Sequence, residues 1–474
     1  MNALTCREIA IATGGTLTTG GEGIIVTGVS TDTRDLKAGD VFFALRGERW
    51  DGHNFVQQAL NKGATLVVVS CAETSWSFRP SQGMLLVDDT TKALGDVASY
   101  YRGSLPAKLI GITGSTGKTT AKSMLNKVLC GLAPTVASPK SFNNHIGVPL
   151  TILSADRHHK FVILEMGTNH FGEIRYLGKM ARPEIGVILN VGPSHLEGLI
   201  DEEGVARAKA ELLPELARGA TAILNADNRH TREMARSCSR KILTFGESED
   251  ANFRITELGD SSDGLIFKVN NYEVRLNVAG RHNAWNAAAC IAICGALGLD
   301  LAAAVEGLAA FQPPPMRMEK KQCAGVMFLN DMYNSNPLSA KAALDTLAGM
   351  KTDGRRIFLC SDMRELGASS EALHGELGAY AAQRGIDALY AIGDHARFTA
   401  LGAREAGLSE SLFFEEIEDV VGQMAGSLKP GDAVLLKASR AMGLEKVMSR
   451  LEEVLAKMSG NVQKMPINNI AKVA

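Results

Sequence analysis

The sequence lacks an excess of charge of either sign, and this absence limits its choice of partners. Its 474 residues include 50 Lys and Arg and 52 Asp and Glu, which give a formal net charge of -2 at pH 7. General attraction to nucleic acid needs a basic surface. The composition therefore gives no reason to expect a nucleic-acid partner.

C-x-x-C cysteine pairs and long apolar runs are also missing. The eight cysteines form no C-x-x-C pair, and no charged, apolar and cleavable segment stands at the N-terminus. The absence of both features is typical of a protein in a reducing compartment, so we expect a cytoplasmic protein. The longest apolar run, residues 287–299, is too short to span a bilayer. It should form a buried helix, and we expect no insertion into a membrane.

Aromatic residues are scarce, at 5% of a chain whose hydrophobic content is 45%. The apolar residues are therefore mostly small or aliphatic, which suits helices packed closely on parallel sheets. With about 150 residues per domain, a chain of this length should form three domains.

Short strand-like runs alternate with helical patterns in three stretches, and each stretch reads as an α/β domain. The first covers residues 1–105. The second, residues 106–312, opens on a glycine-rich loop and ends before three consecutive prolines at 313–315, which mark a linker. The third covers residues 313–460. Residues 461–474 are polar and without pattern, so we expect a loose tail.

The glycine-rich loop, GITGSTGKTT at residues 111–120, resembles a phosphate-binding loop with one irregularity. The usual pattern is G-x-x-x-x-G-K-[ST], but Ile112 stands at its first glycine and Gly111 comes one residue too early. A buried strand at 108–113 precedes the loop, and a helical pattern at 119–132 follows it. Backbone N–H groups and the helix dipole at such a turn bind anions.

Each position in this loop has an expected task. Gly114 and Gly117 let the backbone approach phosphate oxygens, Lys118 reaches the outer phosphates, and the Thr119 hydroxyl faces Mg²⁺. The alternative is a glycine turn with a surface lysine. The expected nucleotide contacts are Gly114, Ser115, Thr116, Gly117, Lys118, Thr119 and Thr120.

Two polar residues follow neighbouring strands of the second domain. Glu165 ends the strand at 161–164, and His195 comes after the strand at 184–190. Parallel strands present ligands at their carboxyl ends, where a carboxylate can hold Mg²⁺. The alternatives are an ordinary polar strand end and a structural histidine.

Other candidates have stronger structural alternatives. Lys209 lies in an amphipathic helical pattern at 201–213, where spacing alone favours a solvated lysine. Asn283 and Asn286 share one helix face at i, i+3 and could read an adenine edge, although asparagine more often caps a helix. The polar run at 330–337 reads as a loop before a proline.

Together these motifs resemble the Mur ligase family, the ATP-dependent amide-forming enzymes of peptidoglycan synthesis. The family loop reads G-x-T-G-x-x-G-K-[ST], which accounts for the early glycine at position 111. The resemblance extends along nearly the whole chain through STDTR (30–34), GDVFFALRGERWDGH (39–53), KSFNNHIGVPLT (140–151), EMGTNHFGEI (165–174), HLEG (195–198), GRHN (280–283), MRME (316–319), DMYNSNP (331–337), DMRELG (362–367) and KASR (437–440).

This resemblance implies an architecture and a reaction. A central parallel-sheet ATPase domain with the phosphate loop would stand between an N-terminal UDP-binding α/β domain and a C-terminal Rossmann-like α/β domain. ATP would convert a carboxylate into an acyl phosphate, which an amine then attacks. The motifs are most similar to those of members that join D-alanyl-D-alanine to UDP-N-acetylmuramoyl-tripeptide, and we expect a monomer.

The resemblance also implies roles for single residues. Lys118 would act on the transferring phosphoryl group, Thr119 and Glu165 would hold one Mg²⁺, and His195 with a carbamylated Lys209 would support a second. Further ATP contacts would be Asn283, Asn286, Arg317 and Asp331. Substrate contacts would be Ser30, Asp32, Thr33 and Arg34 for the UDP-sugar, with Asn143, Asn144, Asp362, Lys437, Ser439 and Arg440 for the peptide and dipeptide.

Two other functions remain open at this point. One is a Mur ligase that adds diaminopimelate or lysine to UDP-muramoyl-dipeptide. Ligases that add diaminopimelate typically carry a D-N-P-R motif, which residues 312–474 lack. The other is an ATP-binding switch that makes no bond. The third residue of the peptide, diaminopimelate or lysine, also stays open.

Overall fold

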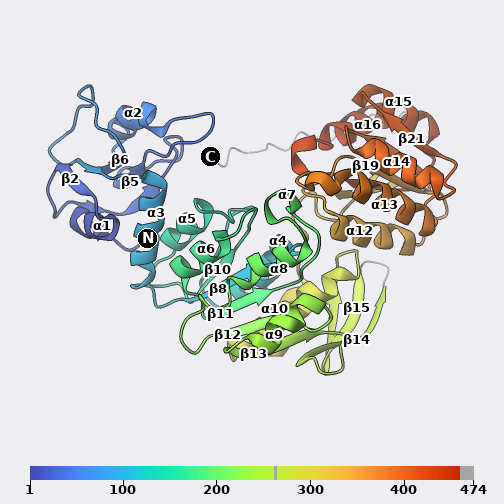
Figure 1. Ribbon diagram of the computed structural model, residues 1–474, viewed down its shortest axis with the longest axis horizontal. Coiled ribbons are helices and arrows are strands. Elements are labelled where there is room, and N and C mark those ends of the chain that lie inside the picture. The colour runs from blue at the N-terminus through green and yellow to red at the C-terminus, as the bar shows by residue number, and fades with distance from the viewer. Residues whose placement is uncertain (261–263, 459–474) are drawn as a thin grey trace.

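The protein is described by a computed structural model that covers residues 1–260 and 264–458. The tail expected at 461–474 and the end of the third segment, 459–460, lie outside the described residues. Three sheets with covering helices follow one another along the chain. The first and third of these units stand on either side of the middle one (Figure 1). The expectation of an α/β fold is confirmed.

The first unit is a five-stranded sheet of order β2-β7-β6-β5-β4, in which β2 alone runs antiparallel to its neighbour. The parallel strands β5 and β6 are buried along their whole length, as the apolar runs predicted. Its strands are β2 (Thr16–Thr19), β4 (Gly28–Ser30), β5 (Asp40–Phe43), β6 (Leu66–Val69) and β7 (Gly83–Leu86), with a ribbon of β1 (Leu4–Thr5) and β3 (Ile25–Val26) and helices α1 (Cys6–Thr13), η1 (Gly52–Phe55), α2 (Val56–Asn61) and α3 (Thr90–Arg102).

The middle unit contains a nine-stranded sheet of order β16-β15-β14-β13-β12-β11-β8-β10-β9. The pairs from β9 to β14 are parallel, whereas β14, β15 and β16 form an antiparallel extension that the sequence reading did not predict. The strands are β8 (Lys108–Thr113), β9 (Thr135–Ala137), β10 (Phe161–Glu165), β11 (Ile185–Ile188), β12 (Thr221–Asn225), β13 (Lys241–Gly246), β14 (Phe253–Asp260), β15 (Leu265–Val269) and β16 (Tyr272–Leu276).

Helices cover this sheet and carry several of the candidate residues. The apolar run at 287–299 lies mainly in α10, and its residues 287–294 are buried, as predicted. The helices are α4 (Lys118–Cys130), α5 (Gly147–Ser154), α6 (Glu173–Ala181), α7 (Leu196–Leu199), α8 (Glu202–Ala210), α9 (Arg229–Ser237), α10 (His282–Ala296) and α11 (Leu301–Ala309).

The third unit has a six-stranded sheet of order β17-β18-β22-β19-β20-β21, in which only β17 is antiparallel. Its strands are β17 (Glu319–Cys323), β18 (Val326–Asp331), β19 (Arg356–Cys360), β20 (Ala388–Ile392), β21 (Ser411–Phe414) and β22 (Ala433–Lys437). Its helices are α12 (Pro337–Gly349), η2 (Gly367–Ser369), α13 (Ser370–Gln383), α14 (Ala396–Glu405), α15 (Ile417–Ser427), η3 (Arg440–Met442) and α16 (Glu445–Met458).

Strand order in the middle sheet decides where the candidate residues meet. The strand before the phosphate loop, β8, lies between β10 and β11. The three carboxyl ends therefore form one edge, at the position where α/β sheets bind ligands.

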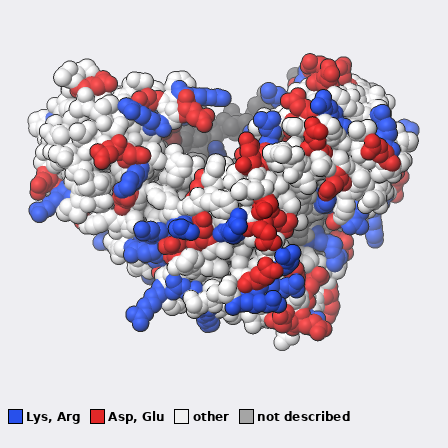
Figure 2. All heavy atoms as spheres, in the orientation of Figure 1, with Lys and Arg blue, Asp and Glu red and all other residues white. Residues whose placement is uncertain are grey.

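The surface agrees with the balanced composition. Acidic and basic side chains are interspersed over the visible face, and the first and third units rise on either side of a hollow (Figure 2). Among the described residues, no helix has the length and apolar character needed to cross a membrane.

Candidate active site

The phosphate loop leaves β8 and leads directly into α4. Gly117 has φ +82°, in the left-handed region that glycine tolerates best. A Cβ at this position would lie 2.4 Å from Oδ1 of Asn286, so the loop packs closely on α10. Lys118 Nζ donates a hydrogen bond to the carbonyl of Gly114 at 2.6 Å. The amine thus lies across the turn that would hold phosphate.

Two residues that the sequence reading did not select hold this loop from the end of β11. Oδ1 of Asn190 accepts a hydrogen bond from the backbone N–H of Thr116 at 2.9 Å. The carbonyl of Gly192 accepts one from Oγ of Ser115 at 2.8 Å. Asn190 ends the predicted strand at 184–190, so its strand-end position was the available signal.

Glu165 is buried at the end of β10 and gathers polar groups from three segments. Its Oε1 accepts hydrogen bonds from the Thr119 hydroxyl and from Nδ2 of Asn143, both at 3.1 Å. Arg317, from beyond the proline linker, donates to the same hydroxyl at 2.9 Å. Sequence reasoning placed Thr119 and Glu165 together, and the structure brings them into contact.

Lys122 is the neighbour of Glu165 that the sequence reading missed. Its Nζ lies 3.0 Å from Oε2 of Glu165, and the side chains are only 4% and 1% exposed. The amine also donates to the carbonyl of Lys140. Lys122 looks like an ordinary helix residue in the sequence, because its ion partner lies 43 positions away.

These groups line a cavity of about 1450 Å³. The middle unit contributes the loop, Glu165 and His195, while the third contributes Arg317, Asp331 and Lys437. No lining residue comes from the first unit. The cavity therefore lies between the second and third sheets.

Next to the loop, the cavity lining includes the cations of Lys118 and Arg317 and the carboxylate of Glu165. Burial lowers the pKa of Lys118, and Glu165 opposes that shift. Burial likewise lowers the pKa of Arg317, with Glu165 and Asp331 opposing it. Cations that have lost their water are stabilised by a bound anion. A polyphosphate fits this arrangement.

The third unit presents a second ion pair to the same cavity. Nζ of Lys437 lies 2.9 Å from Oδ2 of Asp331, and burial lowers the pKa of the amine. The guanidinium of Arg317 stacks 4.3 Å from the ring centre of Tyr333. The run at 330–337 is therefore more than a loop: it ends β18 and then caps α12 through Asn336.

Asn283 and Asn286 line the cavity from inside α10, so neither caps the helix. Nδ2 of Asn286 donates to Oδ1 of Asn283 at 3.1 Å, and Nδ2 of Asn283 donates to the carbonyl of Ala279 at 2.8 Å. Their shared face is confirmed, and the two amides orient one another.

His195 reaches the cavity, but one of its nitrogens already has a partner. Nδ1 is hydrogen-bonded to the carboxylate of Glu365 in the third unit. That hydrogen bond is the largest cause of a lowered pKa at Glu365. Glu365 lies in the DMRELG motif at 362–367, before α13 begins at Ser370.

Lys209 is buried in α8, with 2% of its surface exposed. The solvated lysine that helical spacing favoured is therefore wrong. Burial lowers the pKa of its amine well below the ordinary value, and the charge of Lys118 lowers it further. Lys209 does not line the cavity itself. It lies behind the cavity wall, close enough to Lys118 for the charge of that side chain to lower its pKa.

Three family descriptions match along the chain. They are the Mur ligase family catalytic domain at residues 25–102, the Mur ligase middle domain at 112–294 and the Mur ligase glutamate ligase domain at 316–440. The chain is also 35% identical over 437 residues to the UDP-N-acetylmuramoyl-tripeptide–D-alanyl-D-alanine ligase of Bacillus subtilis, covering 91% of this chain and 94% of that protein. The chain belongs to the Mur ligase family.

Other members agree in length and fold. The enzyme of the same name from Escherichia coli is 35% identical over 445 residues, which cover 91% of this chain and 95% of that protein. A crystal structure of MurF from Acinetobacter baumannii superposes with a TM-score of 0.86 at 31% identity, over 96% of this chain and 99% of that one. MurF from Thermotoga maritima, solved with ADP, gives a TM-score of 0.81 at 27% identity, over 91% and 99%.

In this Mur ligase the expected UDP-sugar residues lie apart from the cavity, at the end of β4. Ser30 and Thr33 are buried, and the hydroxyl of Thr33 donates to Oε1 of Gln58 at 2.8 Å. Nε of Arg34 donates to both carboxylate oxygens of Asp32, at 3.0 and 2.9 Å. The structure groups these four residues on the first unit.

The expected dipeptide residues are grouped less closely. Oδ1 of Asp362 caps α14 by accepting from the N–H groups of His395 and Ala396, both at 2.9 Å. Ser439 is buried beside it, and Arg440 pairs with Glu445 at 2.7 Å. Of the peptide set, the cavity lining includes only Asn143, Asn144 and Lys437.

Proposed function

We propose that this protein is an ATP-dependent ligase that joins D-alanyl-D-alanine to the peptide carboxylate of UDP-N-acetylmuramoyl-tripeptide. The observation that carries the proposal is the match to enzymes of that name over nine-tenths of both chains. The cavity between the second and third sheets supports it, because a ligase must bring a nucleotide and an amine to one carboxylate. The reaction belongs to cytoplasmic cell-wall precursor synthesis, carried out by a monomer.

The three units divide the substrates among them. Residues 1–105 hold the UDP-sugar through Ser30, Asp32, Thr33 and Arg34, and residues 106–312 hold ATP. Residues 313–460 hold the dipeptide, with Asp362, Lys437, Ser439 and Arg440 as contacts and Asn143 and Asn144 facing the peptide from the middle unit. The loop from Gly114 to Thr120 binds the phosphates of ATP. Asn283 and Asn286 contact the adenine. Arg317 and Asp331 contact the nucleotide from the third domain.

Mg²⁺ fits the residues at the end of β10. Thr119 Oγ1 and Glu165 Oε1 are hard oxygen donors 3.1 Å apart, which is the donor type that Mg²⁺ prefers. Oε2 of Glu165 is buried and pairs with Nζ of Lys122 at 3.0 Å, so Lys122 would share this carboxylate with the ion. Mg²⁺ bound there would neutralise phosphate charge. A second ion would use Nε2 of His195 together with Lys209, while Nδ1 of His195 keeps its hydrogen bond to Glu365.

The chemistry requires an activated carboxylate, because an amine does not displace oxide from a carboxylate anion. The substrate carboxylate oxygen takes the γ-phosphoryl group, ADP leaves, and the amine of the dipeptide displaces phosphate from the acyl phosphate. Lys118 and Arg317 oppose the negative charge that builds on the phosphoryl group. The Glu165 carboxylate keeps the Thr119 hydroxyl oriented toward the nucleotide.

The burial of Lys209 supports its proposed carbamylation. Only a neutral amine adds to CO₂, and burial lowers the pKa of this amine. The product carries a carboxylate in place of an ammonium group, so it relieves repulsion from Lys118. The new oxygens would then support the second cation.

One assay tests the assignment. Purified protein receives ATP, Mg²⁺ and UDP-muramoyl-tripeptide, and phosphate release is measured with each amine. We expect release with D-alanyl-D-alanine and almost none with diaminopimelate, lysine or single D-alanine. Turnover of UDP-muramoyl-dipeptide with a free diamino acid would identify a ligase that adds a single amino acid. Phosphate release independent of both acceptor and amine would identify a switch.

A further inference from the structure

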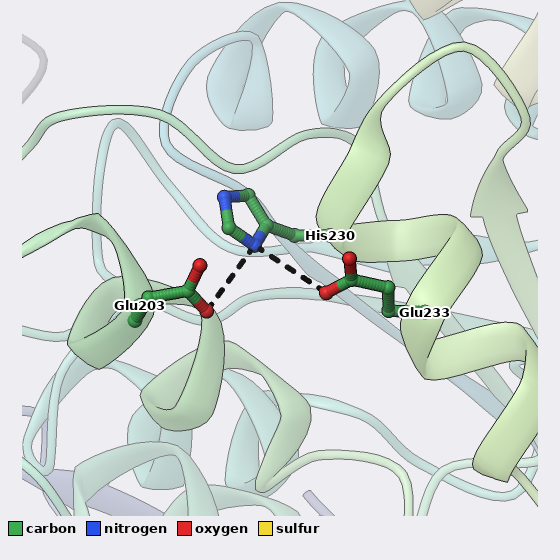
Figure 3. Close-up of side chains that lie close together, drawn as sticks. All are labelled: Glu203, His230 and Glu233. Carbon is green, nitrogen blue, oxygen red and sulfur yellow. Dashed lines mark ion pairs between the residues drawn. The ribbon is translucent and has the colours of Figure 1, made fainter.

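Three side chains on the middle domain converge away from the active-site cavity. Glu203 comes from α8, and His230 and Glu233 come from α9 at i, i+3, so both lie on one helix face. Figure 3 shows the imidazole facing both carboxylates. None of the three lines the cavity. The function proposed above makes no use of them.

His230 is held with one nitrogen aimed at this cluster. Its side chain is 6% exposed, and Nε2 lies 3.0 Å from Oε1 of Glu202. A carboxylate at that distance accepts a hydrogen bond from Nε2, and in the neutral imidazole with that tautomer Nδ1 carries a lone pair. Nδ1 is buried and has no hydrogen-bond partner among the described residues. A lone pair directed at carboxylates is repelled unless a cation lies between them.

Arg229 determines which carboxylate oxygens remain available. Its Nη2 lies 3.2 Å from Oε1 of Glu203, and its Nε lies 3.0 Å from Oε1 of Glu233. The two Oε2 atoms are left facing Nδ1 of His230, at 3.7 and 4.0 Å. The guanidinium therefore orients both carboxylates from outside, as partners behind metal ligands do.

We propose that Nδ1 of His230 and the Oε2 atoms of Glu203 and Glu233 bind a divalent transition metal ion of the Zn²⁺ type. The three ligand atoms all lie within 4.8 Å of one another. Zn²⁺ takes imidazole nitrogen and carboxylate oxygen at about 2.0–2.2 Å, so donors around one ion are roughly 4 Å apart or less. A slight approach of the three ligand atoms to one another brings them to that spacing. Mg²⁺ prefers oxygen ligands and is disfavoured by the imidazole.

The ion would join α9 to α8, the helix that carries Lys209. Glu203 is near the start of α8, and Lys209 is near the end of the same helix. A bridge to α9 would therefore fix the helix that positions Lys209 behind the cavity wall. The competing occupant is a proton, which would make His230 a cation among three carboxylates.

Zinc titration of the chelator-treated full-length protein tests the site. We expect one calorimetric Zn²⁺ site that persists in excess Mg²⁺, together with a higher unfolding midpoint when Zn²⁺ is added. His230→Gln should abolish both effects, and Glu233→Gln should weaken binding at least about tenfold. His158→Gln, an exposed histidine far from the cluster, is the matched control and should bind like the wild type.

Spectroscopy provides an independent measure. Co²⁺ in the site should give a visible absorption band that Zn²⁺ removes and Mg²⁺ does not. If His230→Gln does not fold, the partly exposed Glu233→Gln serves in its place, with circular dichroism as the fold check. Equal Zn²⁺ affinity and stoichiometry in the wild type and these variants would overturn the proposal. In a Zn²⁺-free assay with Mg²⁺, ligation by Glu233→Gln should equal that of the wild type, so the Zn²⁺ result does not depend on the proposed function.

Discussion

The imidazole of His195 in the middle domain is hydrogen-bonded to the carboxylate of Glu365 in the third. Both residues have positive φ, +53° and +65°, and the backbone N–H of Glu197 donates to the carbonyl of Glu365 at 3.2 Å. A proposed metal-binding side chain is thus engaged by another domain. Nδ1 of His195 holds this contact between the domains, and Nε2 remains available to a ligand.

Glu365→Ala should loosen this contact between the domains. A partly exposed pair of this kind contributes about 0.2–1 kcal/mol, so amide exchange at 195–200 and 362–367 should speed up a few-fold. The strands of all three sheets should be unchanged. Glu371→Ala, on the exposed start of α13, is the control. Unaltered exchange in Glu365→Ala would show that the pair does not hold the domains.

Lys118→Ala should retain the fold and lose turnover by roughly 10²–10³-fold, because a cation at the transferring phosphoryl group is removed. Circular dichroism checks the fold, and phosphate release measures the turnover. Lys127→Ala, exposed on the same helix, should ligate normally. Near-normal ligation by Lys118→Ala would refute the assignment of the phosphate loop.

Lys122→Met should destabilise the middle domain by about 3–5 kcal/mol, because it leaves the buried Glu165 carboxylate without its ion partner. Urea unfolding followed by fluorescence measures the loss. Adding Glu165→Gln should recover most of it, since the uncompensated charge disappears. Lys127→Met controls for the substitution itself, and equal midpoints for Lys122→Met and this control would count against the pair.

Lys209→Met should stabilise the protein while abolishing ligation. The folded-state pKa of Lys209 is depressed, so between that value and the unfolded value of about 10.4 only the unfolded chain binds the proton. Wild-type stability should therefore rise with pH in this window, and Lys209→Met should lose that slope. Thermal unfolding in CO₂-free buffer at several pH values tests this, with the exposed Lys179→Met as control.

Lys209→Ala should be nearly inactive and partly rescued by short carboxylic acids, which can occupy the space of a carbamate. Turnover with added acetate or formate is the measurement. Lys118→Ala should show no rescue, because it loses a cation and not a carboxylate. A fully active, metal-loaded enzyme whose Lys209 has an unmodified mass would contradict carbamylation.

The local parts of the site could be predicted from sequence for a physical reason. The phosphate loop is made by consecutive residues, and its task follows from a strand, glycines and a helix start in that order. Glu165 and Thr119 could be placed together because parallel strands share one carboxyl edge. The antiparallel strands β15 and β16 were missed, since short mixed-polarity runs carry little periodic signal.

The sequence by itself determined the α/β class, the phosphate loop and the strand-end carboxylate, because each depends on residues close together in the chain or on strand order. Tertiary structure alone decided that Lys122 neutralises Glu165, that Lys209 is buried, and that His195 meets Glu365. Those facts depend on packing and on the relative placement of domains. Ion pairs formed across 43 or 170 positions leave no periodic trace in a sequence.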